Sequence, residues 1–438
     1  MTRATWWPPQ QIDLPTLVAA TDRVEGQRGL EVDVRHQVLA IVALGLEWEV
    51  ATAVVQPADE SAIPLGADGR RIGVIMLHGA MGDHRDMLPV AQFLARHYGY
   101  RVSVMSYPGR YYLPDPAGEW PGDTIRPDGT LRTPMWHRRH PVEDDEYEVV
   151  TDRSDPVRRA KWGTLTFAAA RPGTPFHDRM AAWPAAFETA LIELARRDFP
   201  DPQFSVYVHG HSTGGPFAHM ILQRIPNVAG LLGAETSSFP YIFRAGIGMD
   251  WPYPFNYLAI LSWRNIAMYA GPEHGADLQW RLPWVMEEVL EEWDRQKTRP
   301  FFKAEYFFNY AAAAQLEACA RAAAARLKMS SAAEDELVRH YVGYSRELPA
   351  HEGRAVPPLL LGIVKGSRDH TIERYNQVIL PMLSQIEPRP KVALVQYGGG
   401  VHQYGKSLPG LPRGALPAIA ETWNQAIQEG FFVSSANG

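Results

Sequence analysis

Residues 204–216 read Phe204-Ser205-Val206-Tyr207-Val208-His209-Gly210-His211-Ser212-Thr213-Gly214-Gly215-Pro216. Four of the first five are β-branched or aromatic, which is typical of a buried strand. A GxSxG motif follows, and residues 217–225 can form a helix with Pro216 in its first turn. A serine on so sharp a turn has a strained backbone and an exposed hydroxyl, and the flanking glycines avoid a clash. GxSxG alone is a weak signal, but this strand-turn-helix context predicts that Ser212 is a nucleophile.

The composition bounds the class of protein. The chain has 438 residues, 46% hydrophobic and 21% charged, which indicates a soluble globular protein of one large domain with insertions or of two to three domains. Its net charge of −6 argues against a nucleic-acid or anionic-membrane partner. The single cysteine, Cys319, excludes an internal disulfide. We find no signal-peptide core and no run of about 18 apolar residues, so we expect a cytoplasmic protein without a membrane span.

Further buried strands precede and follow the GxSxG motif. Residues 36–45 and 47–57 suit an antiparallel pair, residues 86–97 and 411–431 suit helices, and other apolar runs suggest strands at 72–77, 100–107, 228–234, 357–364 and 391–396. The strand at 72–77 ends in His78-Gly79-Ala80-Met81-Gly82. A glycine-rich turn there can point backbone N–H groups at an anion, although taken alone this loop is more readily interpreted as a plain strand-to-helix turn.

Two long segments interrupt this pattern. Residues 109–177 are too long for an ordinary connection, and residues 237–350 change to a helical period. Together they hold eight of the thirteen tryptophans. These aromatic side chains either build small cores of the insertions themselves or belong to a lid that lines an apolar pocket over Ser212.

Three strand ends carry the chemistry. A serine hydroxyl needs a base to take its proton and a carboxylate to orient that base. Because the carboxyl ends of parallel strands share one edge of a sheet, Ser212, Asp369 and His402 can converge there. Glu235, after the strand at 228–234, is the competing carboxylate, and we favour Asp369 because it heads a strand-turn-helix unit. His209 and His211 form an HxH pair without a third ligand, so we expect no metal and no cofactor.

In this order, these features resemble the α/β-hydrolase superfamily over roughly residues 35–235 and 355–432. The resemblance implies a mostly parallel eight-stranded sheet flanked by helices. It places one long insertion, residues 109–177, after strand four and a helical cap, residues 237–350, after strand six. The core then comprises residues 31–236 and 351–438, and residues 1–30 form an arm or edge element. The implied roles are a Ser212 nucleophile, a His402 base and an Asp369 orienting acid, with an oxyanion hole from the backbone of Thr213 and of Ala80 or Met81.

These expectations suggest a serine hydrolase. A serine nucleophile suits an acyl-enzyme route, and we expect the substrate to be a small apolar or aromatic ester or lactone. An amidase, an acyltransferase and a catalytically idle binding protein with the same fold are the alternatives. Substrate contacts are expected from Tyr107, His211, Trp251 and Trp284. Paired tryptophans near the N-terminus could dock on a neighbouring subunit, which leaves a homo-oligomer open.

Overall fold

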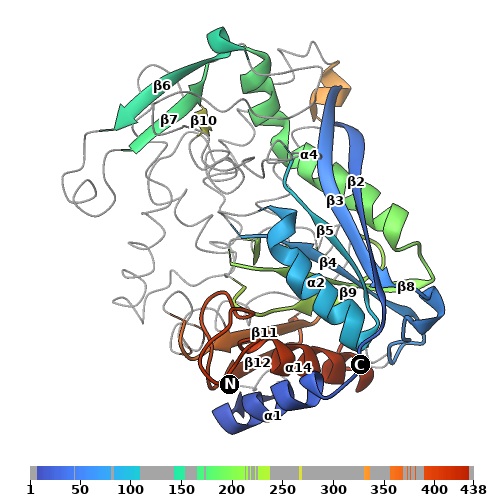
Figure 1. The fold of residues 1–438 in the computed structure, drawn as a ribbon. Helices are drawn as coiled ribbons and strands as arrows, with labels where there is room; N and C mark the ends of the chain where they lie inside the picture. The colour runs from blue at the N-terminus through green and yellow to red at the C-terminus, as the bar shows by residue number, and fades with distance from the viewer. Residues whose placement is uncertain are drawn as a thin grey trace.

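The computed structural model describes most of the core and parts of both insertions. The described residues are 7–43, 45–79, 83–108, 143–152, 165–171, 174–212, 214–215, 218, 222, 225–236, 266–268, 330–335, 356–367, 372, 375, 380 and 389–433. Figure 1 gives the arrangement of the elements.

The elements follow one another along the chain as a mixed α/β series. The strands are β1 (Trp7–Ile12), β2 (Val32–Ala43), β3 (Leu46–Pro57), β4 (Arg71–Leu77), β5 (Arg101–Met105), β6 (Tyr147–Asp152), β7 (Leu165–Ala170), β8 (Phe204–Gly210), β9 (Val228–Leu232), β10 (Ile266–Met268), β11 (Leu359–Val364) and β12 (Val392–Tyr397). The α-helices are α1 (Leu14–Glu25), α2 (His84–Tyr98), α4 (Pro175–Asp198) and α14 (Leu416–Gln428), and short 3₁₀ helices cover Glu60–Ala62 and Asp144–Glu146. The strands and helices predicted from the sequence on these residues are therefore confirmed, within a few residues at their ends.

The described strands of the core form one nine-stranded sheet in the order β1-β12-β11-β9-β8-β4-β5-β3-β2. The pairs from β5 through β4, β8, β9, β11 and β12 to β1 are all parallel, whereas β3 is antiparallel to both β5 and β2. Because β8, β9, β11 and β12 are neighbours and run in the same direction, the loops that follow them leave from one edge of the sheet.

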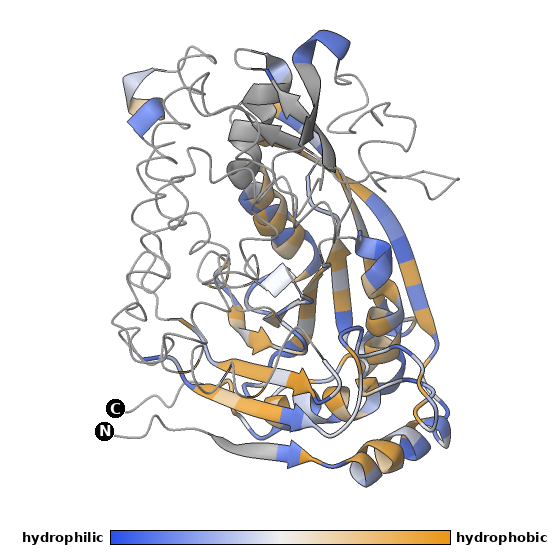
Figure 2. Cartoon of the chain, turned by 90° about the vertical axis from the view of Figure 1, so that its left-hand side faces the viewer, coloured by the Kyte–Doolittle hydropathy of each residue, from blue (hydrophilic) through white to orange (hydrophobic). Residues whose placement is uncertain are grey.

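Helices pack on both faces of the sheet, as alternation along β4 shows. Ile72, Val74 and Met76 belong to one buried cluster with α1, α2 and α14. On the other face, a Cβ added at Gly73 would lie 2.4 Å from the ring of Phe199, which directly follows α4. Strands are consequently apolar on both sides, and the helices are apolar on one side only (Figure 2).

The N-terminal segment joins the core. Residues 1–30 were expected to be an arm or edge element, and the sheet was expected to have eight strands. The edge element is confirmed, because β1 pairs in parallel with β12 at the edge of the sheet, which has nine strands and not eight. Helix α1 packs beside α14 (Figure 1). Leu17, Ala20 and Val24 of α1 are at most 5% exposed, which explains why this helix docks on the core.

The two insertions meet in a small second sheet. Strands β6 and β7, from the insertion at 109–177, form an antiparallel pair. Strand β10, from the segment at 237–350, pairs in parallel with β7. Figure 1 shows this three-stranded sheet at the opposite end of the molecule from α1. Elsewhere in the expected helical cap, the structure describes only residues 330–335, of which 331–335 are helical.

Candidate active site

Ser212 lies on a strained turn directly after β8. Its φ is +51°, a left-handed conformation that non-glycine residues rarely adopt. A Cβ added at Gly210 would lie 2.3 Å from the carbonyl oxygen of Gly214, and one added at Gly214 would lie 2.7 Å from that of His78. Both glycines are therefore required by close backbone approach, as the GxSxG pattern predicted.

Glu235 follows β9 and lies beside this turn. The Ser212 N–H donates to the Glu235 carbonyl oxygen at 2.8 Å, so the backbones of the two residues are directly joined. Glu235 also has a left-handed φ of +51°, and its side chain is 0% exposed. A buried carboxylate is costly unless it is hydrogen-bonded, so its partners decide what it does.

Three donors satisfy the Glu235 carboxylate. The Val364 N–H donates to Oε1 at 2.8 Å, and the Ser367 hydroxyl donates to Oε2 at 2.6 Å. His402 Nδ1 lies 2.9 Å from Oε2. These donors come from the ends of β11 and β12, so the carboxylate is held where three neighbouring strands end.

The carboxylate that the structure places against His402 is thus that of Glu235. Sequence analysis favoured Asp369, which lies outside the described residues, and kept Glu235 as the competing acid. The position of β9 explains this contact. Because β9 lies immediately beside β8 in the sheet, the Glu235 side chain starts next to the turn at Ser212.

His402 belongs to a loop between β12 and α14. Gly400 in this loop has a φ of +131°, which favours glycine, and its Cβ position would crowd the Val364 side chain at 3.0 Å. The His402 side chain is 19% exposed, whereas the side chain of Glu235 is fully buried.

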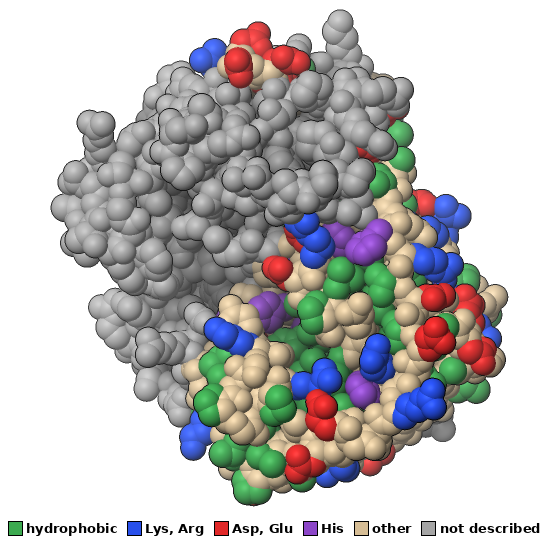
Figure 3. Space-filling model, in the orientation of Figure 1, with side chains coloured by type: hydrophobic (Ala, Val, Ile, Leu, Met, Phe, Trp, Pro, Cys, Tyr) green, Lys and Arg blue, Asp and Glu red, His purple; other side chains and the backbone are tan. Residues whose placement is uncertain are grey.

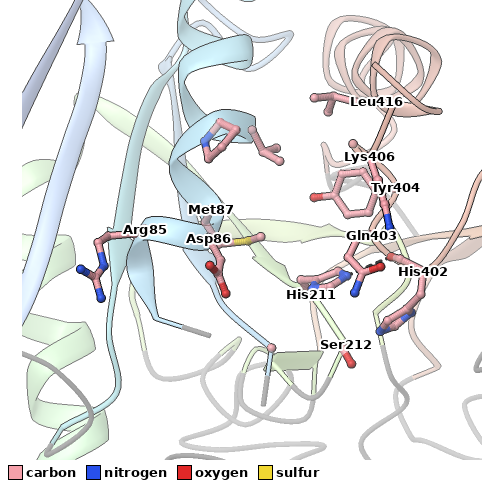
Figure 4. A pocket seen from close by; sticks show the side chains of 14 residues that line it. Arg85, Asp86, Met87, His211, Ser212, His402, Gln403, Tyr404, Lys406 and Leu416 are labelled. Atoms are coloured by element: carbon pink, nitrogen blue, oxygen red, sulfur yellow. Dashed lines mark hydrogen bonds between the residues drawn. The ribbon is translucent and has the colours of Figure 1, made fainter. Parts of the chain in front are cut away.

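A pocket of about 640 Å³ connects these groups with α2. Figure 4 shows Met87 and Asp86 of α2 on one side, Gln403, Tyr404 and Lys406 on the other, and Ser212 and His402 at one end. The remaining lining residues are Gly79, Arg85, Pro89, Val90, His211, Gly405 and Leu416. The volume is in the range of small-molecule sites. On the face in Figure 3, apolar and histidine side chains are interspersed with charges of both signs.

Other expected substrate contacts have different outcomes. His211 lines the pocket. Tyr107 is 0% exposed, its hydroxyl donates to the His78 carbonyl at 2.5 Å and its ring packs on Phe187. Tyr107 is therefore a core residue that contacts the loop after β4. Trp251 and Trp284 lie outside the described residues.

The loop expected to supply the oxyanion hole is described only at its ends. Thr213, Ala80 and Met81 lie outside the described residues. At the near end, a Cβ on Gly79 would lie 3.3 Å from His211 Nδ1 and 3.4 Å from Ser212 Cβ, so the loop after β4 begins directly beside Ser212. At the far end, Asp83 is the N-cap of α2 and accepts from the Arg85 N–H, while Asp86 is exposed, as expected for a cap and a surface charge.

Sequence reasoning missed Ser367 and Tyr404. Ser367 lies three residues beyond the end of β11, and its hydroxyl donates a hydrogen bond to the Glu235 carboxylate. Tyr404 is two residues beyond His402 and is 1% exposed. The signal that could have found both residues is their position, since each is a polar residue within a few positions of a strand end. The carboxylate or histidine that such a residue contacts, however, depends on the order of strands in the sheet.

Among the residues that the structure describes, no group of three or more histidine, cysteine or acidic side chains is arranged to hold a metal ion. Likewise, none of the helices in the described part of the chain is long and apolar enough to cross a membrane.

The sheet order, the strained serine after β8 and the histidine after β12 are those of the α/β-hydrolase fold. Comparison with known proteins gives only distant likenesses. No protein-family model and no curated protein sequence matches the chain.

Three solved structures illustrate these likenesses. Acylaminoacyl peptidase from Pyrococcus horikoshii is 10% identical with a TM-score of 0.37, over 92% of this chain and 42% of that one, so the chain spans less than half of that protein. An esterase from Rhizomucor miehei is 12% identical with a TM-score of 0.36, over 95% and 90% of the two chains. S-formylglutathione hydrolase from Staphylococcus aureus is 11% identical with a TM-score of 0.35, over 93% and 99%.

Proposed function

We propose that this protein is a serine hydrolase that cleaves a carboxylic ester or lactone through an acyl-enzyme intermediate. In this proposal Ser212 is the nucleophile, His402 the general base and Glu235 the acid that orients His402. The observation that carries it is the 2.9 Å hydrogen bond between His402 Nδ1 and a fully buried carboxylate whose backbone is itself bonded to Ser212.

The hydrogen bond decides which nitrogen of His402 is basic. A carboxylate only accepts hydrogen bonds, so Nδ1 carries a proton and the lone pair of neutral His402 is on Nε2. Nε2 then takes the Ser212 proton as Oγ attacks the substrate carbonyl carbon. The proton passes to the leaving alcohol as the C–O bond breaks. Water then attacks the acyl-enzyme, gives its proton to Nε2, and the acid leaves as Ser212 is restored.

The negative charge on the carbonyl oxygen in each step requires backbone donors. We assign this role to the N–H groups of Thr213 and of Ala80 or Met81, as the superfamily resemblance implies. The closeness of Gly79 to Ser212 supports this assignment, because the 80–82 loop begins there.

The pocket supports a small-molecule substrate with an apolar part. Met87, Pro89, Val90 and Leu416 supply apolar walls, and charged or polar side chains such as Lys406 lie in the same lining. An acyl or alcohol group can therefore bury its apolar surface beside Ser212. We also propose that the aromatic side chains of Trp251 and Trp284 contact the substrate.

The first experiment is labelling with a fluorophosphonate probe, followed by peptide mapping and by a series of chromogenic esters from acetate to long-chain and aryl acids. We expect label on Ser212 and an optimum in the ester series. Ser212→Ala should abolish labelling and turnover while the thermal midpoint is retained. Turnover by folded Ser212→Ala, or label on another residue, would contradict the proposal.

A further inference from the structure

His209 and His211 flank Gly210, and the side chains of both reach the loop that carries His402. The loop occupies residues 398–415, between β12 and α14. The two histidines belong to the same segment as Ser212, and Figure 4 shows His211 between Ser212 and the side chains of that loop.

His209 contacts the loop through Tyr404. Its ring is 0% exposed, and its Nδ1 lies 2.6 Å from the Leu232 carbonyl oxygen. Because a carbonyl accepts, Nδ1 carries the proton and Nε2 is an acceptor. The Tyr404 hydroxyl lies 2.9 Å from Nε2 and donates to it. A fixed tautomer thus holds a tyrosine that is two residues from the proposed base.

His211 contacts the loop at His402 itself. Its Nε2 lies 3.0 Å from the His402 carbonyl oxygen, so Nε2 carries a proton and donates. The two imidazole rings are 4.8 Å apart between centroids, and the His211 ring also contacts Tyr404 edge-to-face at 5.7 Å. The Nε2 donor and the ring of His211 therefore both contact the same short stretch, residues 402–404.

The loop needs such contacts because it has no helix or strand of its own at His402. The imidazole must lie within a hydrogen bond of Ser212 Oγ, and an error of about 1 Å can cost about a hundredfold in rate. A bond from the residue next to Ser212 to the backbone of His402 fixes this relation directly.

We infer that His209 and His211 are positioning residues, which hold the His402 loop against the nucleophile turn through Tyr404 and the His402 carbonyl. This inference rests on the proposed function, in which His402 acts on Ser212. It also gives the HxH pair of His209 and His211 a role that does not involve a metal ion.

Two amide substitutions at His211 test the inference. The side-chain nitrogen of glutamine reaches about as far as Nε2 of histidine, and that of asparagine reaches only about as far as Nδ1. We expect His211→Asn to lower kcat for a chromogenic ester and the rate of fluorophosphonate labelling by about a hundredfold with little change in KM. His211→Gln should restore most of that loss.

Tyr404→Phe is a second variant, which removes one hydroxyl and keeps the ring. We expect slower labelling of Ser212 in folded protein, measured alongside the thermal midpoint. It keeps the test decisive if His211→Asn does not fold.

The outcomes separate the two proposals. If the wild-type protein is not labelled at Ser212, the proposed function fails and takes the inference with it. If the wild-type protein is labelled and folded His211→Asn or Tyr404→Phe reacts equally fast, the inference alone is overturned. Equal loss in His211→Asn and His211→Gln would also overturn it, because the ring would then matter for packing and not for its donor.

Discussion

Replacing Glu235 by glutamine tests the proposed active site most directly. The substitution keeps the size of the side chain and removes its charge. In the wild-type structure Oε1 accepts from the Val364 N–H, so the amide oxygen of glutamine is expected to take that place. The amide NH₂ then replaces Oε2, which faces Ser367 and His402.

The expected effect follows from the tautomer of His402. An NH₂ group donates, so it favours a lone pair on Nδ1 and a proton on Nε2 of His402. Nε2 must instead carry a lone pair if it is to accept the Ser212 proton. The equivalent change in serine-protease triads lowers kcat by about ten-thousandfold. We expect a loss of about a thousandfold to ten-thousandfold, or about 4 to 5.5 kcal/mol in activation free energy.

The assay is kcat for the best chromogenic ester, with the thermal midpoint as a check on folding. Asp369→Asn is the matched control, because Asp369 is the other carboxylate that the sequence offers for the same role. We expect less than about a twofold change in that variant. A folded Glu235→Gln with activity within tenfold of wild type, together with a severe loss in Asp369→Asn, would refute the assignment and return Asp369 to the site.

Three further predictions concern stability and the turn. Leu17→Ala should lower the free energy of unfolding by about 2–5 kcal/mol in urea titration, because Leu17 is 1% exposed in the core; no change would show that α1 does not dock. Gly214→Ala should abolish Ser212 labelling because its Cβ would meet backbone atoms at 2.7 and 2.8 Å, and normal labelling of this variant would contradict the argument. Burial lowers the pKa of His209 to about 3 and that of His84 to about 4. The unfolded chain binds these protons near pH 6.5, so stability should fall from pH 7 to 5 by about 2 kcal/mol per histidine, and a flat urea midpoint over that interval would contradict this.

Local sequence was sufficient for most of the core elements. A buried strand, a helix and a tight turn each depend on neighbouring residues, so the strand before Ser212, the glycines around it and the helix at the C-terminus could be predicted from pattern alone. The same is true of the antiparallel pair β2 and β3, which a short connection joins.

The pairing of the N-terminal segment and the carboxylate that contacts His402 could not be predicted from local sequence pattern alone. Residues 7–12 carry two prolines and no clear alternation, so their pairing with β12 depends on an exposed edge nearly four hundred positions away in the chain. Local turn propensity around Asp369 favoured that residue, whereas the structure shows the contact of His402 with Glu235.

The sequence by itself determined the tight turn at Ser212 and the series of strands, because these follow from periodicity, glycine spacing and strand-turn-helix order. Only the tertiary structure decided which side chains meet. The order of strands in the sheet puts the end of β9 beside that of β8, and so brings Glu235 to His402 and Ser367 to Glu235. It likewise sets His209 and His211 against the loop after β12. Contacts between segments so far apart in the chain depend on backbone pairing across the whole sheet, which no local pattern encodes.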